Sequence, residues 1–278
     1  MTYTTLLSSD TLAQHINDSN LIIIDCRFSL ADSEAGAKAY RMGHIKNARY
    51  AHLDNDLSST ISNSTGRHPL PNFSSLVKKL GQWGVTNNSQ VIVYDDANGT
   101  FASRLWWLLR CLGHEAVAVL DGGITHWQHS LTTTLPPITT KIFRPYLDPS
   151  NWLSAIDISN KLATHSIQLI DARTPERFIG EQDPIDPIAG HIPYAINRAF
   201  QLNLTENGLF IQRDKLRNQF ISLLGPYTPK QTVHMCGSGV TACHNLLAME
   251  CAGLSGSKLY AGSWSEWITN QNRPVATH

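Results

Sequence analysis

The residues with the clearest chemical potential form one short run, His-Met-Cys-Gly-Ser-Gly-Val-Thr-Ala-Cys, at positions 234–243. Within it, Cys236 follows an apolar segment and precedes a glycine-bearing loop that leads into a helical pattern. Backbone N–H groups of such a loop converge on one point, and the positive end of the helix adds to them. Because a thiolate is an anion, this arrangement favours ionised cysteine. Mere core packing would not need Gly237 and Gly239 beside the sulfur, so we expect Cys236 to be a nucleophile.

The spacing of this loop argues against a related chemistry. Cysteine phosphatases and arsenate reductases grip a tetrahedral oxyanion with the arginine of a Cys-x5-Arg motif. Ala242 occupies the arginine position in this chain. A loop with N–H donors and no arginine suits a smaller anion, such as a terminal persulfide on Cys236.

The loop resembles the active-site loop of the rhodanese superfamily. Its Cys-Gly-Ser-Gly-Val-Thr run is similar to the mercaptopyruvate type, whereas vertebrate thiosulfate enzymes carry basic residues there. The resemblance implies an α/β protein of two tandem rhodanese-like domains, each a mostly parallel sheet flanked by helices. It also implies that a Cys236 persulfide forms without a dissociable cofactor, cradled by loop residues Gly237, Gly239, Val240 and Thr241.

An internal repeat supports two similar halves. Asp-Cys-Arg at 25–27 matches Asp-Ala-Arg at 171–173, and Gly-His-Ile occurs at both 43–45 and 190–192. Short apolar runs typical of buried parallel strands alternate with helical patterns in both halves. The predicted strands are 21–24, 91–94, 116–120, 167–170, 232–235 and 258–260. We expect domains at 1–135 and 151–278, with a proline-rich linker at 136–150.

The first half lacks a counterpart of the nucleophile. The offset of 140 residues between Trp127 and Trp267 places Asp96 opposite Cys236, and no thiol lies at 95–99. We therefore expect the N-terminal domain to be catalytically silent.

An arginine past a strand end is a candidate for binding an anionic donor. Arg177 follows the predicted strand 167–170, on the side where α/β sheets bind ligands. In the enzymes that this chain resembles, the matching arginine holds the substrate. Mercaptopyruvate enzymes carry a second arginine in a Glu-Pro-Arg segment, where positions 183–187 read Asp-Pro-Ile-Asp-Pro. This departure leaves thiosulfate, other sulfane donors and a protein persulfide open.

A polar stretch in the first half offers candidates for proton transfer. In mercaptopyruvate sulfurtransferases an aspartate and a histidine from this region meet the loop serine, here Ser238. Asp54 and His68 are the matching positions, with Asp56 as an alternative to Asp54. Such a relay could protonate a leaving enolate; alternatively, His68 only bonds within its own loop. Its neighbour Arg67 is a further candidate for holding the donor.

Composition narrows the possible partners and compartment. The 278 residues include 22 basic and 22 acidic ones and no basic run, so nucleic acid and anionic membranes are not expected partners. We predict no signal peptide and no membrane span. Five cysteines without a pairing pattern argue against a disulfide framework and a metal site, and favour the cytoplasm.

Together these features predict an enzyme that moves a sulfane sulfur from 3-mercaptopyruvate or thiosulfate through a Cys236 persulfide. The acceptor would be cyanide, a thiol or a thioredoxin-like protein. Two alternatives stay open. One is a thiosulfate-specific rhodanese or a persulfide carrier that takes sulfur from a protein donor, and the other is a non-catalytic rhodanese-like binding module.

Overall fold

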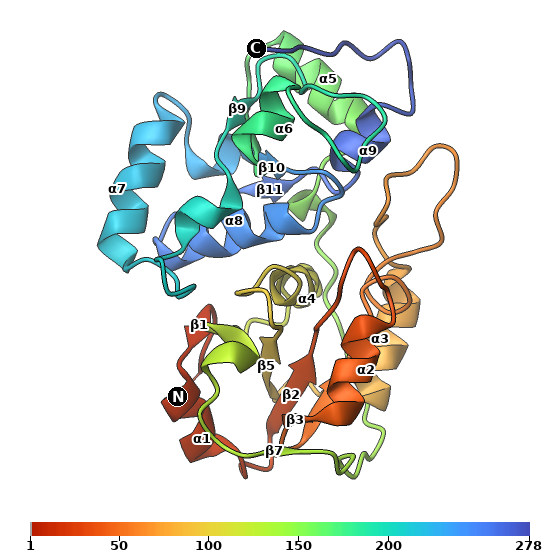
Figure 1. The fold of residues 1–278 in the computed structure, drawn as a ribbon, viewed down its shortest axis with the longest axis vertical. Coiled ribbons are helices and arrows are strands. Elements are labelled where there is room, and N and C mark those ends of the chain that lie inside the picture. Colours follow the sequence, from red (N-terminus) through yellow and green to blue (C-terminus); the bar gives the residue numbers. More distant parts are fainter. Residues whose placement is uncertain (1) are drawn as a thin grey trace. The chain divides into compact units, whose positions relative to one another are not determined.

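The computed structural model describes residues 2–278, which form two compact units (Figure 1). The first unit comprises the residues up to Ser59 together with Leu70–Asp148. The second comprises Thr60–Pro69 and Pro149–His278. Residues 60–69 therefore lie within the first half of the sequence but pack with the second unit.

The first unit is built on a parallel sheet of five strands in the order β1-β6-β5-β2-β4. Its strands are β1 (Leu6–Leu7), β2 (Leu21–Asp25), β4 (Ala48–Tyr50), β5 (Gln90–Tyr94) and β6 (Val117–Leu120). A small antiparallel pair joins β3 (His44–Ile45) to β7 (Leu131–Thr132). The helices are α1 (Ser9–His15), α2 (Ala35–Met42), α3 (Phe73–Gln82), α4 (Ala102–Cys111) and the short η1 (Gly123–His126).

The second unit repeats this plan with four parallel strands in the order β11-β10-β8-β9. Its strands are β8 (Gln168–Asp171), β9 (Ile196–Asn197), β10 (Thr232–Met235) and β11 (Lys258–Leu259). Its α-helices are α5 (Ala155–Ala163), α6 (Pro175–Ile179), α7 (Arg213–Leu224), α8 (Thr241–Cys251) and α9 (Ser263–Trp267). Three short 3-10 helices complete it: η2 (Pro149–Asn151), η3 (Phe200–Asn203) and η4 (Pro229–Gln231).

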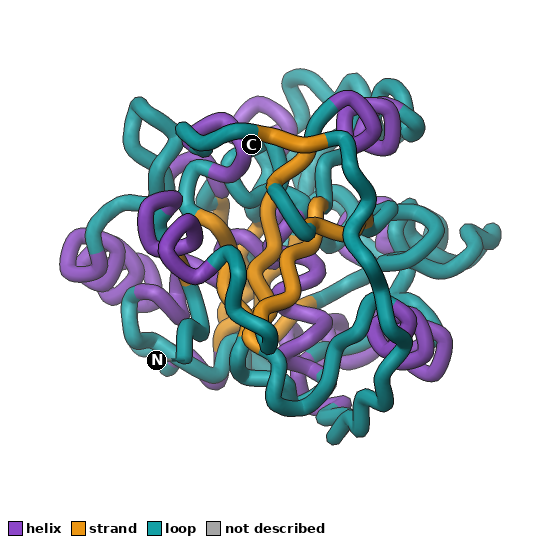
Figure 2. The backbone as a smooth tube through the Cα atoms, turned by 90° about the horizontal axis from the view of Figure 1, so that it is seen from below, coloured by secondary structure: helices purple, strands orange, loops and turns teal. Residues whose placement is uncertain are grey.

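The six predicted strands form as β2, β5, β6, β8, β10 and β11, because their apolar runs are covered on both faces; β1, β3, β4, β7 and β9 were not predicted. In β2 the run Leu-Ile-Ile-Ile-Asp is buried at all but its first residue, which is typical of a parallel strand with helices and loops on either side (Figure 2). Helix starts are also local: Asn72 caps α3 by accepting the Ser75 N–H at 3.0 Å. The predicted α/β class, with a mostly parallel sheet in each half, is confirmed.

The segment expected as a linker is attached to the first unit as far as Asp148. Its backbone bonds to the ends of two helices: Lys141 N–H donates to Gly81 O at 2.9 Å, and Tyr146 N–H to Leu112 O at 2.9 Å. A proline-rich composition predicts a segment without regular secondary structure. In this segment, the backbone hydrogen bonds to Gly81 and Leu112 hold the irregular chain in place. Across residues 2–278, no helix is long and apolar enough to cross a membrane.

Candidate active site

Cys236 lies directly after β10, in the loop that leads to α8, with 2% of its surface exposed. The Gly239 N–H donates to its Sγ over 3.1 Å. Gly239 has a φ of +76°, and a β carbon there would lie 2.2 Å from the carbonyl oxygen of Ala261. Only glycine fits this left-handed, crowded position, so the loop conformation that aims the N–H at the sulfur depends on it.

The loop is held from behind by α9. The carbonyl oxygen of Cys236 accepts the Trp264 N–H at 3.0 Å, and that of Gly237 accepts the Ser265 N–H at 2.9 Å. The Cys236 N–H in turn donates to Ser263 Oγ at 3.1 Å. Sequence reasoning noted this Gly-Ser-Trp segment only as part of the repeat, yet it fixes the backbone on which the thiol sits.

Val240 and Thr241 lie at the N-terminus of α8, a helix of 11 residues in which Thr241 is the first. The first backbone N–H groups of a helix have no partner within it and carry the positive end of its dipole. Both residues therefore belong to a turn that favours an anion at the preceding loop. The neighbouring thiol of Cys243 is fully buried and donates to the Gly239 carbonyl oxygen at 3.4 Å.

Strand register identifies the counterpart of Cys236 in the first unit. Asp25 pairs with Tyr94 as Asp171 pairs with Met235, so the residue after Tyr94 corresponds to Cys236. That residue is Asp95, and the expectation of Asp96 was wrong by one position. The tryptophan offset failed because the first unit has one more residue between this strand and the segment that backs the loop.

The carboxyl group of Asp95 lies where the second unit has its thiol; burial raises its pKa, and the backbone N–H groups around it oppose that rise. Its carboxylate is fully buried and accepts four backbone N–H groups at 2.7–2.9 Å. The donors are Ala97, Gly99 and Phe101, in the loop before α4, and Ala102, the first residue of that helix. The loop after this strand thus gathers N–H groups around a negative charge, which is the property that we expect of its counterpart at Cys236.

Two arginines lie beside Gly237. A β carbon at Gly237 would be 2.9 Å from Arg67 Nη2 and 3.3 Å from Arg177 Nη2. Arg177 comes from α6, which begins at Pro175 and ends before Gly180. The structure therefore brings together Arg67, Arg177 and Gly237, three residues predicted to bind the sulfur donor. Gly237 directly follows Cys236 in the chain.

Two buried carboxylates, missed by sequence reasoning, pair with these arginines. Asp183 accepts Arg177 Nε at 3.1 Å, and Asp186 accepts Arg177 Nη2 at 2.8 Å and also binds Arg67 Nη1. Both side chains are 1% exposed. Burial favours the neutral form of Asp183, but the Asp186 N–H and the Arg177 guanidinium outweigh it and lower the pKa of Asp183. The segment 183–187 was interpreted only as lacking an arginine, although its aspartates carried the signal.

His68 reaches the active-site loop from the segment 60–69. Its Nδ1 lies 2.7 Å from Ser238 Oγ, and both side chains are buried. The segment is anchored next to it, since the Arg67 N–H donates to Ser265 Oγ at 3.0 Å. The geometry therefore joins two members of the predicted relay.

The third predicted member, Asp54, belongs to the first unit. Its backbone N–H donates to His52 Nδ1 at 3.1 Å. Burial raises the pKa of its carboxyl group, and the charge of His52 opposes this. The alternative, Asp56, binds Lys79 Nζ at 2.8 Å and accepts the His52 N–H at 2.9 Å. The place of Asp54 in a relay stays a prediction.

Comparison with known proteins identifies the family. Residues 8–130 and 154–270 each match the rhodanese-like domain. The chain belongs to the rhodanese family. It is a sulfurtransferase with two rhodanese domains in tandem, as its sequence predicted.

Several proteins of this family are similar over the full length. The chain is 44% identical over 277 residues to a probable 3-mercaptopyruvate sulfurtransferase from Pseudomonas aeruginosa, covering 98% of both. It is 30% identical over 282 residues to a thiosulfate sulfurtransferase from Cricetulus griseus, covering 96% of this chain and 92% of that one. The solved structure of a 3-mercaptopyruvate sulfurtransferase from Leishmania major has a TM-score of 0.84 at 28% identity, covering 98% and 76%.

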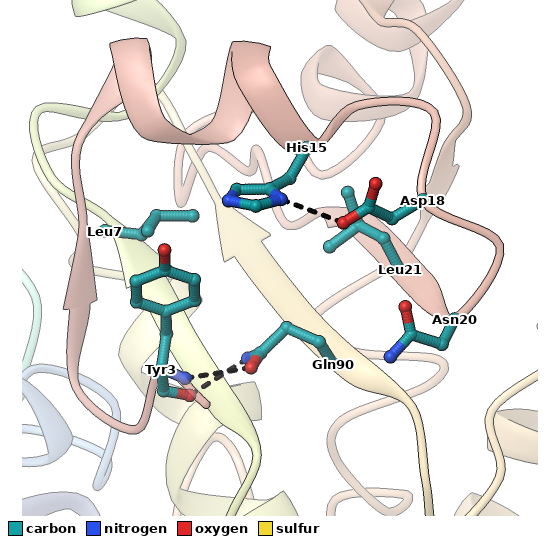
Figure 3. Close-up of a pocket in the computed structure, with 7 residues that line it drawn as sticks. All are labelled: Tyr3, Leu7, His15, Asp18, Asn20, Leu21 and Gln90. Carbon is teal, nitrogen blue, oxygen red and sulfur yellow. Dashed lines mark hydrogen bonds and ion pairs between the residues drawn. The ribbon is translucent and has the colours of Figure 1, made fainter. Parts of the chain in front are cut away.

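A hollow elsewhere in this rhodanese chain lacks the side chains that surround Cys236. It lies in the first unit and is lined by Tyr3, Leu7, His15, Asp18, Asn20, Leu21 and Gln90 (Figure 3). His15 bonds to Asp18 at 2.8 Å, and the Gln90 side chain bonds to the Tyr3 backbone at 2.9 Å. It has no cysteine and no arginine. In the part of the chain that the structure describes, no cluster of three metal-binding side chains occurs.

Proposed function

We propose that this protein transfers a sulfane sulfur from 3-mercaptopyruvate or thiosulfate through a persulfide on Cys236. The single observation that carries the proposal is the loop around Cys236. It combines an N–H donor on the sulfur with two guanidinium groups beside the next residue. A thiolate and an anionic sulfur donor would otherwise repel each other. The N–H group and the two guanidinium groups offset that repulsion.

In the first half-reaction the Cys236 thiolate attacks the outer sulfur of the donor. A bond forms between the two sulfurs, and the C–S bond of mercaptopyruvate or the S–S bond of thiosulfate breaks. Its electron pair leaves with pyruvate enolate or sulfite. Arg67 and Arg177 hold the donor's anionic group, while the backbone N–H groups of the loop from Gly237 to Thr241 stabilise the persulfide.

The two leaving groups differ in their need for a proton. Sulfite is stable as it leaves, whereas pyruvate enolate must be protonated. We propose that Ser238 delivers this proton and that His68 restores it, with Asp54 as a third group. The support is the 2.7 Å distance between Ser238 Oγ and His68 Nδ1.

In the second half-reaction an acceptor removes the outer sulfur and regenerates Cys236. We propose cyanide, a small thiol or a thioredoxin-like protein as acceptors. We also propose that the first domain is catalytically silent, since Asp95 stands in place of a nucleophile. We also propose the reducing cytoplasm as its compartment, because the five cysteines show no pairing pattern in the sequence.

The direct test is the intact mass of the reduced protein after brief exposure to each donor, with pyruvate and sulfite measured in parallel. We expect a gain of one sulfur on the wild type and none on Cys236→Ser. Cys243→Ser is a matched control, because this second thiol is buried on α8, and it should still gain the sulfur. Equal gain in Cys236→Ser would refute the proposal, and no gain with either donor would favour a protein donor or a binding module.

A further inference from the structure

Asp186 occupies a position that the proposed chemistry does not use. Its carboxylate lies between the two donor-binding arginines, with one oxygen on Arg67 Nη1 and the other 2.8 Å from Arg177 Nη2. Its side chain is 1% exposed, while those of Arg67 and Arg177 are 30% and 16% exposed. The carboxylate of Asp186 is therefore buried beneath the two arginines, and solvent reaches the cluster through the arginine side chains.

This contact determines which nitrogens remain for a ligand. Asp186 takes Nη1 of Arg67 and Nη2 of Arg177, and Asp183 takes Nε of Arg177. Arg67 Nη2 lies 2.9 Å from the place of a β carbon on Gly237, and Arg177 Nη2 and Nη1 lie 3.3 and 3.5 Å from it. Asp186 thus holds both guanidinium groups beside the active-site loop, and Arg67 Nη2 and Arg177 Nη1 remain for a ligand.

The same contact cancels the charge of the cluster. Behind these residues, Arg173 forms a paired contact with Asp171 and lies 3.4 Å from Asp183. Three guanidinium groups therefore face three carboxylates, the third of which is Asp186. A sulfur donor that enters meets directed N–H groups but no net positive charge. The Cys236 thiolate adds one negative charge to the site.

We propose that Asp186 makes this site discriminate by the charge of the donor, in favour of a monoanion such as mercaptopyruvate over the dianion thiosulfate. The inference rests on the proposed function and names its donor class. Coulomb energy is proportional to the ligand's charge, so the repulsion from Asp186 is twice as large for a dianion as for a monoanion at the same place. The attraction to the guanidinium groups is also proportional to the ligand's charge, and Asp186 completes the set of three carboxylates that balances it.

The test compares the wild type with Asp186→Asn, which removes the charge and keeps the shape, and with Asp186→Glu, which keeps the charge. Asp96→Asn, on the exposed surface of the first unit, controls for the change in net charge. Cys236 is alkylated with neutral iodoacetamide in the presence of sulfate, a dianion, or pyruvate, a monoanion. The concentration that halves the alkylation rate measures the affinity for each anion without requiring turnover.

We expect Asp186→Asn to tighten sulfate binding on the order of tenfold and pyruvate binding roughly threefold, because the two shifts follow the two charges. The ratio of kcat/KM for thiosulfate to that for mercaptopyruvate should rise in the same direction. Asp186→Glu and Asp96→Asn should keep the wild-type ratios.

Equal shifts for both anions, or weaker binding of both, would overturn the inference and leave Asp186 with a positioning role only. These readings are distinct from failure of the proposed function. That failure would appear as a lack of persulfide on the wild type, whereas the alkylation assay still reports the charge preference.

Discussion

Replacing Asp95 with asparagine tests whether the loop after β5 is built to hold an anion. The carboxylate accepts four backbone N–H groups at 2.7–2.9 Å, two on each oxygen. Asparagine keeps one oxygen and presents an amide NH₂ group to the other two donors. Two charge-assisted hydrogen bonds are lost, and two buried N–H groups face a further donor.

The magnitude follows from these bonds. Hydrogen bonds to a charged group contribute about 1.5–3 kcal/mol each, so the loss of two predicts a destabilisation of about 3–6 kcal/mol. Domains unfold with a free energy of about 5–15 kcal/mol, so the variant should be close to the limit of stability. Asp96→Asn, one residue along and exposed, should change the free energy of unfolding by less than about 0.5 kcal/mol.

Urea unfolding gives the global value, and hydrogen exchange of the peptide that covers residues 96–103 gives the local one. We expect Asp95→Asn to lower the denaturation midpoint and to expose the N–H groups of Ala97, Gly99, Phe101 and Ala102 to exchange. A loss below about 1 kcal/mol with unchanged exchange in this peptide would refute the reasoning. The loop after β5 would then give no support for stabilisation of a Cys236 persulfide by the corresponding loop after β10.

Four further substitutions test the second unit. Gly237→Ala should raise KM for either sulfur donor on the order of tenfold, because the new methyl group pushes the guanidinium groups of Arg67 and Arg177 aside. The free energy of unfolding should stay unchanged, because the ends of the arginine side chains are flexible. An unaltered KM would contradict the placement of the two arginines beside Gly237. Ser238→Ala should lower kcat with mercaptopyruvate by roughly 100-fold or more and affect thiosulfate little, and His68→Asn should follow it; parallel losses with both donors would argue against proton delivery. Gly239→Ala should cost about 1–3 kcal/mol in unfolding from its φ alone, and more from its contact with Ala261; persulfide formation with normal stability would show that the loop can rearrange.

The predictable part of the fold is the part encoded in neighbouring residues. A strand such as β2 or β10 is a short apolar run, and burial on both faces follows from that run with no knowledge of its partners. The proposed nucleophile could be found for the same reason, since Cys236, Gly237 and Gly239 lie within four residues of one another. Arg177 could also be predicted as a ligand-binding residue, because a residue after a parallel strand lies at the edge of the sheet where ligands bind.

The remainder depended on contacts between distant residues. Residues 60–69 cross to the second unit, where His68 meets Ser238 across 170 positions and Arg67 meets Asp186 across 119. No periodicity within the segment specifies such a crossing, because its neighbours in sequence are not its neighbours in space. The offset that chose Asp96 over Asp95 failed similarly, since register is set by hydrogen bonding between strands.

By itself, the sequence determined the parallel α/β plan of each half, the candidate nucleophile Cys236 and the absence of a phosphatase arginine, since each is written in adjacent residues and their apolar pattern. Only the tertiary structure decided which side chains surround the nucleophile and what charge they carry. It revealed Asp186 between Arg67 and Arg177, where a sequence comparison showed only a missing arginine. The physical reason is that charge balance in a site is a sum over groups brought together by folding, and separation along the chain carries no information about those distances.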